Sequence, residues 1–76
     1  MQREILIQFG ERLRELRKEM NLTQVELSEQ AGFDRNYIGM LERGERNPAL
    51  INIQKIANVL NLSLTEFFNG IENKNG

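Results

Sequence analysis

The 76-residue chain contains no cysteine and no histidine. It therefore lacks disulfides, thiolate nucleophiles, Cys/His zinc sites and the usual acid/base group of neutral pH. Its longest apolar runs, such as Leu50 with Ile51 and the stretch around Leu62, are broken by polar residues within a few positions, so we expect no membrane span and no signal peptide. Most enzyme classes are disfavoured, and we expect no metal, no cofactor and a cytoplasmic protein.

A strong excess of one charge is also missing. Ten Lys and Arg stand against eleven Asp and Glu, for a net charge of −1, which argues against a polybasic protein that coats nucleic acid indiscriminately. From Arg35 to Lys55, however, four basic residues outnumber two acidic ones. With 39% apolar residues the chain should fold as one small domain without a large enclosed cavity. Any nucleic-acid binding must come from a local positive surface.

Hydrophobic periodicity and helix-start signals predict five helices and an all-α fold. The strongest signals are two capping boxes, Thr23 with Glu26 and Ser63 with Glu66. The expected helices cover residues 3–20, 24–31 and 35–43, a stretch from about Pro48 through Leu60, and residues 64–69. They should form one compact domain over residues 1–69, followed by a flexible tail over residues 70–76.

Each helix should turn one apolar face toward a shared core. On the first helix this face comprises Phe9, Leu13, Leu16 and Met20, and on the fourth Leu50, Ile53, Ile56, Ala57 and Leu60. Gly39 is unfavourable inside the third helix, by up to about 1 kcal/mol relative to Ala. We interpret it as a position where the backbone comes close to DNA.

The second and third helices are separated only by Gly32-Phe33-Asp34, in which Gly32 suits a left-handed turn and Asp34 an N-cap. Two helices joined by such a turn form a helix-turn-helix, whose second helix enters the DNA major groove. Ser28 is small where the two helices must approach. Any helical bundle contains helix corners, but the agreement of cap, turn and small residue favours the DNA-binding motif.

Several segments resemble known regulators. Leu22–Leu27 (LTQVEL), Ala31–Asp34 (AGFD) and Leu41–Gly44 (LERG) resemble phage repressor and Cro proteins, the lambda-repressor-like or XRE-like class. Asp34–Ile38 (DRNYI) and Glu42–Pro48 (ERGERNP) are similar to segments of restriction-modification controller proteins. The resemblance covers nearly the whole chain. It implies a homodimeric, sequence-specific DNA-binding transcriptional regulator that activates and represses its own promoter at a pseudo-palindromic operator.

The start of the third helix carries the candidate base-reading residues. Arg35 matches the paired acceptors of guanine and Asn36 suits adenine, although an ordinary polar helix start is the alternative. Tyr37 can reach a phosphate or a thymine methyl, or pack against the fourth helix instead. Met40 stands where related repressors often carry a polar base-reading residue, and it allows only an apolar contact. DNA bending would then contribute more to specificity.

Four residues are expected to contact the DNA backbone. Gln24 begins the second helix, where its amide and the helix dipole can meet a phosphate, although a solvated helix start is the alternative. The resemblance implies the same role for Arg43, Arg46 and Asn47, which end or follow the third helix. A surface ion pair with Glu45 is the competing interpretation of the arginines, and such a pair would contribute little.

The resemblance also implies structural and regulatory residues. It implies that Arg17 and Glu42 pair and lock the first helix to the third. It implies that Glu29, on the acidic face of the second helix, meets RNA polymerase, although a solvated surface position is the common alternative.

A dimer contact is expected at the C-terminal end of the domain. This end has more apolar surface than one short helix can bury in its own core, contributed by Val59, Leu62, Leu64, Phe67 and Phe68. We expect Leu64 and Phe68 to be the main contacts of the dimer. The alternative is that Phe67 belongs to the core and Phe68 is a lone exposed aromatic.

Other functions remain as alternatives. A phage-type repressor or an antitoxin has the same fold, but an antitoxin normally adds a segment that wraps its toxin, and the six residues after Gly70 are too few. A helical adaptor without DNA would leave Arg35, Asn36 and Arg46 unexplained. An enzyme would depend on carboxylates alone, which alternate with Arg and Lys on helix surfaces. We therefore expect no enzyme.

Overall fold

A computed structural model describes the backbone of residues 2–71 and the side chains of residues 4–71. Within that range it contains α1 (Gln2–Glu19), α2 (Gln24–Gln30), α3 (Tyr37–Glu42), α4 (Leu50–Val59) and α5 (Leu64–Phe68). Residues 2–71 include no strand, so the all-α prediction is confirmed. Of the tail expected over residues 70–76, residues 72–76 lie outside the described part.

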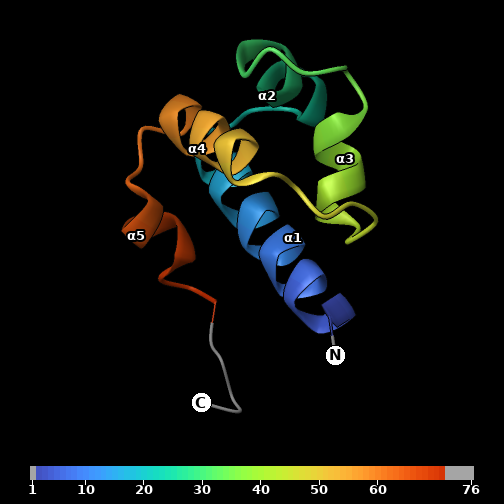
Figure 1. Cartoon of the computed structure of the whole chain (residues 1–76). Coiled ribbons are helices and arrows are strands. Elements are labelled where there is room, and N and C mark those ends of the chain that lie inside the picture. Colours follow the sequence, from blue (N-terminus) through green and yellow to red (C-terminus); the bar gives the residue numbers. More distant parts are fainter. Residues whose placement is uncertain (1, 72–76) are drawn as a thin grey trace.

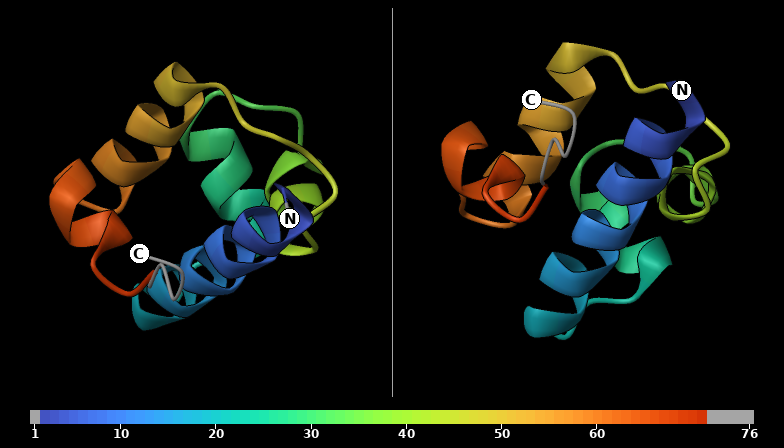
Figure 2. Two further views of the ribbon diagram at one scale, coloured as in Figure 1. Left: turned by 60° about the horizontal axis from the view of Figure 1, so that its bottom comes forward. Right: turned by 90° about the horizontal axis from the view of Figure 1, so that it is seen from below.

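The long helix α1 is the axis around which the shorter helices pack (Figure 1). It contacts α3 and α5, while α2 contacts α3 and α4, and α4 contacts α5. Seen from three directions, α3 and α5 lie on opposite sides of the molecule (Figure 2). The helix-turn-helix pair and the C-terminal helix therefore present separate surfaces.

The core is formed by apolar side chains that every helix contributes. They are Phe9, Leu13, Leu16, Leu27, Ile38, Leu41, Ile53, Ile56, Ala57, Leu60 and Phe67. Phe9 of α1 stacks on Phe67 of α5 with ring centroids 5.3 Å apart. Removing this apolar surface from water supplies the main driving force for folding.

Two residues expected on inner faces lie outside this core. Met20 is exposed because α1 ends at Glu19 and the chain turns through Asn21, which has a positive φ of 57°. Leu50 is 70% exposed because it is the first residue of α4 and lies beyond the edge of the core. In both cases the helical spacing continues past the point at which the helix meets the core.

Both predicted capping boxes are confirmed. The Thr23 hydroxyl accepts a hydrogen bond from the N–H of Glu26 at 3.0 Å, and the Glu26 carboxylate accepts one from the N–H of Thr23 at 2.8 Å. Ser63 and Glu66 repeat this arrangement at the start of α5. The first amides of these two helices thus have partners within the chain.

The third helix begins two residues later than expected. The Asp34 side chain accepts a hydrogen bond from the N–H of Asn36 at 2.9 Å, and its carbonyl accepts one from Tyr37 at 3.0 Å. Asp34 thus closes a turn ahead of the helix rather than capping the helix itself. The turn covers residues 31–36, with Gly32 at φ 81°. Arg35 and Asn36 therefore belong to the turn and not to α3.

Gly10 determines how closely α1 and α3 pack, and sequence reasoning missed it. An added Cβ would lie 2.5 Å from the Leu41 carbonyl oxygen and 2.6 Å from that of Glu42. Only a residue without a side chain fits at this crossing. A glycine within an otherwise regular amphipathic pattern gives little warning of such a contact, because periodicity does not report which helix faces it.

Candidate nucleic-acid interface

The inner side of α3 is held by a buried polar cluster. Arg17 donates from Nε to Glu42 Oε2 at 2.6 Å and from Nη2 to Oε1 at 3.1 Å. Its Nη1 donates to the Leu22 carbonyl at 2.7 Å, and Gln24 Nε2 donates to Glu42 Oε1 at 2.9 Å. The Glu42 side chain is only 3% exposed. Its negative charge is therefore neutralised inside the protein and withdrawn from the outer surface.

Gly39 serves this cluster rather than an external ligand. It is buried, and an added Cβ would lie 3.0 Å from Gln24 Oε1 and 3.2 Å from Arg43 Nη1. Gly39 thus makes room for two side chains of the protein, which differs from the approach to DNA expected from the sequence. Gln24 is half-buried, with one amide hydrogen committed to Glu42 and the other unused in the described part of the chain.

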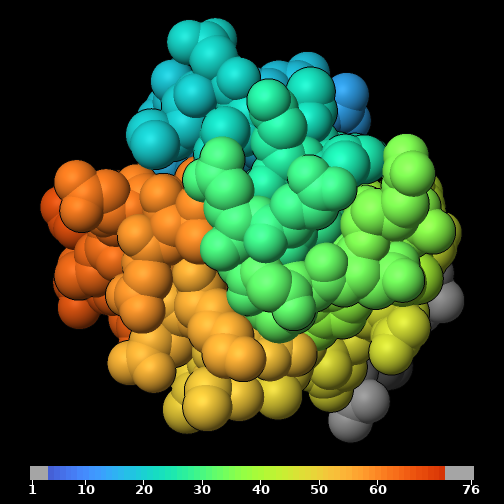
Figure 3. All heavy atoms as spheres, turned by 90° about the horizontal axis from the view of Figure 1, so that it is seen from above, coloured from blue at the N-terminus to red at the C-terminus, as the bar shows by residue number. Residues whose placement is uncertain are grey.

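The outer side carries the exposed candidates for DNA contact. Arg35 and Asn36 are exposed in the turn before α3, and Arg46 and Asn47 are exposed in the loop that follows it. Figure 3 shows that the turn, α3 and the following loop run together across one face of the molecule. Residues separated by as many as twelve positions are thereby brought onto one surface.

Tyr37 is half-buried at the junction of α3 and α4. Its ring lies 4.7 Å from that of Phe33, and its hydroxyl accepts a hydrogen bond from Asn52 Nδ2 of α4 at 3.2 Å. Tyr37 thus packs toward the fourth helix, as one of its two sequence interpretations required. Lys55 of α4 lies 6.0 Å from the centre of the Phe33 ring and completes this junction.

Arg43 and Arg46 have local partners in the free protein. Arg43 Nε pairs with Glu45 Oε2 at 2.8 Å, and this hydrogen bond raises the pKa of Arg43 and lowers the pKa of Glu45. Both side chains are at least half exposed, so the pair stabilises the fold little and can exchange with another anion. Arg46 Nη1 lies 3.8 Å from the sulfur of Met40, which is half-buried beneath it.

The charge of this face is positive. Between residues 35 and 47 the exposed ionised side chains are Arg35, Arg43, Arg46 and Glu45, because Glu42 is buried against Arg17. With Asp34, which is exposed in the same turn, three cations stand against two anions on this face, although the chain as a whole carries −1. Such a local positive surface attracts the phosphate backbone of DNA.

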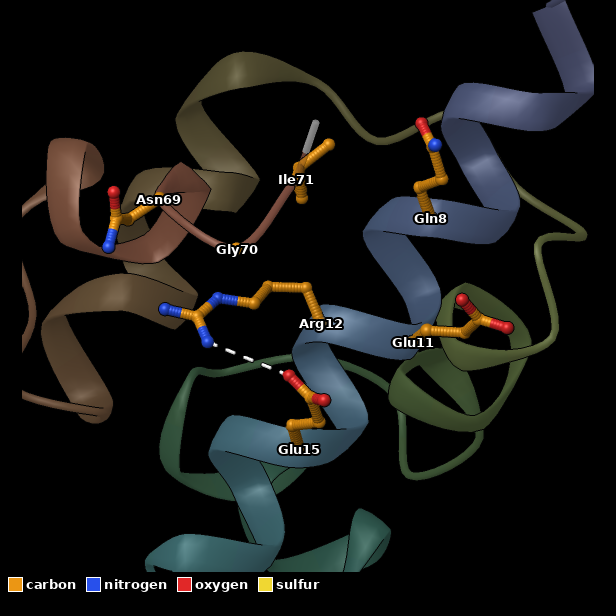
Figure 4. A pocket seen from close by; sticks show the side chains of 7 residues that line it. All are labelled: Gln8, Glu11, Arg12, Glu15, Asn69, Gly70 and Ile71. Carbon is orange, nitrogen blue, oxygen red and sulfur yellow. Dashed lines mark ion pairs between the residues drawn. The ribbon is translucent and has the colours of Figure 1, made fainter. Parts of the chain in front are cut away.

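A pocket of about 270 Å³ lies elsewhere, between α1 and the residues after α5 (Figure 4). Arg12 crosses it, donating to the carbonyls of Phe67 at 2.7 Å and Glu66 at 2.8 Å and lying 3.6 Å from Glu15. Arg12 thereby caps the end of α5 and joins α5 to α1. This pocket is therefore part of a structural contact between the two helices. Among the described residues, no three metal-binding side chains cluster and no helix is long and apolar enough to cross a membrane.

The residues expected at a dimer contact differ in exposure. Phe67 is fully buried in the core, and Leu64 is half-buried against it. Phe68 is 37% exposed, with its ring 6.2 Å from that of Phe9. Phe67 is therefore a core residue, as the alternative interpretation required, because a fully buried side chain cannot contact a second subunit. Glu29, expected to meet polymerase, is exposed on α2.

Known proteins are similar to this chain in sequence and in fold. Residues 13–67 match the helix-turn-helix family. Control protein C.MunI of a Mycoplasma species is 41% identical over 70 residues, which cover 91% of this chain and 95% of that protein. The crystal structure of the restriction-modification controller protein C.AhdI from Aeromonas hydrophila is 48% identical with a TM-score of 0.80, covering 83% of this chain and 96% of that one. A structure of the C.Esp1396I nucleoprotein complex has a TM-score of 0.79 at 26% identity, covering 91% and 96%. The chain belongs to the helix-turn-helix family of DNA-binding transcriptional regulators.

Proposed function

We propose that this protein is a homodimeric regulator that binds a specific operator and controls a restriction-modification system by activating and repressing its own promoter in the cytoplasm. The positive outer face of the turn, α3 and loop is the observation that carries the proposal, because its exposed side chains carry a net positive charge although the chain as a whole carries −1. Similarity to the controller proteins C.MunI and C.AhdI over most of their lengths supports the restriction-modification role.

The proposal assigns two kinds of DNA contact. Arg35 and Asn36 project from the turn before α3 and would read base edges in the major groove. The remaining polar candidates, which are Gln24, Arg43, Arg46 and Asn47, would contact phosphates and fix the register of the protein on the duplex. Met40 is half-buried and would contribute at most an apolar contact.

A matched set of alanine substitutions tests these roles on the DNA upstream of the protein's own gene. Arg35→Ala should cost about 1–3 kcal/mol on the operator and relax sequence preference, whereas Arg46→Ala should weaken all sequences together and lower the salt slope by about 1. Arg14→Ala, at an exposed position of α1, is the control and should change neither. Wild-type binding that does not change with salt would reject the proposal.

Twofold pairing would set two such faces about 34 Å apart, one turn of the duplex. Exposure favours a contact centred on Leu50 and Ile51, at the start of α4, over one centred on α5. Leu50 is 70% exposed and Ile51 is 62% exposed, whereas Phe67 is fully buried and the ring of Phe68 packs beside that of Phe9. Two neighbouring exposed apolar side chains would form the apolar centre of such a contact.

Sedimentation checks this pairing. Ile51→Glu should convert a dimer into a monomer and weaken operator binding, because it places a charge in an apolar contact. Ile5→Glu, at a position of α1 that is 49% exposed, is the matched control and should leave the dimer intact. A dimer that survives Ile51→Glu but dissociates with Phe68→Glu would move the contact back to α5.

The proposal also assigns Glu29 a contact with RNA polymerase. Its exposure on α2 leaves its carboxylate accessible. Glu29→Lys should abolish activation in a transcription assay while operator binding is unchanged. Equal loss of activation and binding would show that Glu29 acts through DNA or through the fold.

A further inference from the structure

Asn52 is not among the residues assigned to DNA contact, but its side chain contacts Tyr37, which is one of the candidates. Its side chain lies in the first turn of α4, and its Nδ2 donates a hydrogen bond to the Tyr37 hydroxyl oxygen at 3.2 Å. Both side chains are half-buried, at the junction of α3 and α4. The hydrogen bond therefore ties the first residue of α3 to the next helix.

The direction of this hydrogen bond determines what the Tyr37 hydroxyl can offer. A phenolic hydroxyl has one hydrogen to donate, and an amide nitrogen can only donate. Asn52 therefore occupies an acceptor site of the hydroxyl and leaves the hydrogen unused. Within residues 4–71 no side chain or carbonyl accepts that hydrogen. Tyr37 directly follows Arg35 and Asn36, which are exposed on the positive face.

We propose that Asn52 is a positioning residue that holds the Tyr37 hydroxyl as a donor to an acceptor atom of the operator, either a phosphate oxygen or a base edge. This inference rests on the proposed function, since it needs DNA on the outer face. It assigns Tyr37 a polar contact and gives Asn52 a role in affinity without a DNA contact of its own.

The nearly isosteric substitution Asn52→Asp tests the direction of the hydrogen bond. A carboxylate only accepts, so it would capture the Tyr37 hydroxyl hydrogen and remove it from DNA. Asp also suits the first turn of a helix, so the variant should remain folded. Because the new charge alone would weaken DNA binding, the same substitution is made in the Tyr37→Phe background, where no hydroxyl exists and only the charge acts.

The measurement is a double-mutant cycle on a duplex carrying the DNA upstream of the protein's own gene. Asn52→Asp should weaken binding roughly 3- to 10-fold more in the wild-type background than in the Tyr37→Phe background, the worth of one hydrogen bond. Asn52→Ala leaves the hydroxyl free to turn toward DNA and should give a smaller coupling than Asn52→Asp. Equal losses from Asn52→Asp in the two backgrounds overturn the inference.

A shuffled duplex distinguishes the two sources of the acceptor. Coupling on both duplexes identifies a phosphate, and coupling on the native sequence alone identifies a base edge. Tyr37 is the only tyrosine and the chain has no tryptophan, so intrinsic fluorescence reports this hydroxyl, and quenching by the carboxylate verifies the reversed hydrogen bond. Salt-independent wild-type binding without preference for the native duplex would reject the proposed function. Specific binding without coupling rejects only the role of Asn52.

Discussion

The two sides of α3 are built differently. On the inner side Arg17, Glu42 and Gln24 are joined by hydrogen bonds, and no buried side-chain polar atom of the described residues lacks a partner. On the outer side, the side chains of Arg35 and Asn47 are exposed and make no hydrogen bond or ion pair within residues 4–71. Polar groups on the inner side stabilise the domain, and those on the outer side are available to a ligand.

The helix starts show the same division. Both α2 and α5 begin with a capping box, whereas the N-cap residues of α3 and α4, Asn36 and Ala49, make no side-chain cap hydrogen bond. The first amides of α3 have other partners, since the Tyr37 N–H donates to the Asp34 carbonyl at 3.0 Å and the Ile38 N–H to the Ser28 hydroxyl at 3.2 Å. The Asn36 side chain is exposed and makes no hydrogen bond within residues 4–71. Stability and binding should therefore respond to different substitutions.

The largest effect is expected on the inner side. Arg17→Met leaves the buried Glu42 carboxylate without its cation and should reduce the free energy of unfolding by about 3–5 kcal/mol in urea titrations. The double variant Arg17→Met/Glu42→Leu removes both charges and should recover most of the loss. Arg14→Met, on the exposed face of α1, should have little effect. If Arg17→Met reduced the free energy of unfolding only slightly, the polar cluster of Arg17, Glu42 and Gln24 would not stabilise the packing of α1 on α3.

Two glycines give the next test. Gly10→Ala should cost about 1–3 kcal/mol, because its Cβ would meet backbone oxygens of α3 that cannot move aside. Gly39→Ala should cost less, because its Cβ meets the ends of the Gln24 and Arg43 side chains and alanine favours the helix by up to about 1 kcal/mol. Thermal unfolding of both variants measures the difference, and equal losses would contradict this account of the α1–α3 contact.

Local signals explain what the sequence predicted well. The capping boxes at Thr23 and Ser63 use residues three positions apart, and the apolar stripes of α1 and α4 follow one helix at a time. These features depend on near neighbours in the chain. The five helices and the helix-turn-helix corner could therefore be predicted before any tertiary contact was known.

Long-range contacts explain the failures. Leu50 fits the helical stripe of α4 yet lies beyond the core, and Gly10 matters only because α3 crosses it. The hydrogen bond between Asn52 and Tyr37 joins residues fifteen positions apart. No local pattern reports which elements meet or where a core ends. The exposure of the candidate DNA-contact residues and the hydrogen bond between Asn52 and Tyr37 therefore required the structure.

The helix starts give a smaller and more specific test. Thr23→Ala removes a side-chain cap from α2 and should cost about 1 kcal/mol of stability. Asn36→Ala removes no cap bond from α3 and should change stability by less than about 0.5 kcal/mol, while it weakens operator binding by about 1–3 kcal/mol. Paired urea and DNA-binding titrations compare the two variants. A large loss of stability in Asn36→Ala would show that the start of α3 also belongs to the scaffold.

The smallest expected effect is a change in stability at acidic pH. The Ser63 backbone N–H donates to the Glu66 carboxylate at 2.9 Å, and this hydrogen bond lowers the pKa of Glu66 below its ordinary value of 4.5. Since the unfolded chain binds the proton more readily, the stabilisation is complete above the ordinary pKa and is lost as pH falls through the lowered one. Glu66→Gln keeps a capping amide but cannot titrate. Its melting temperature should lie slightly below that of the wild type at neutral pH, and the gap should close in acid. A gap that stays constant with pH would mean that the carboxylate charge contributes nothing to the start of α5.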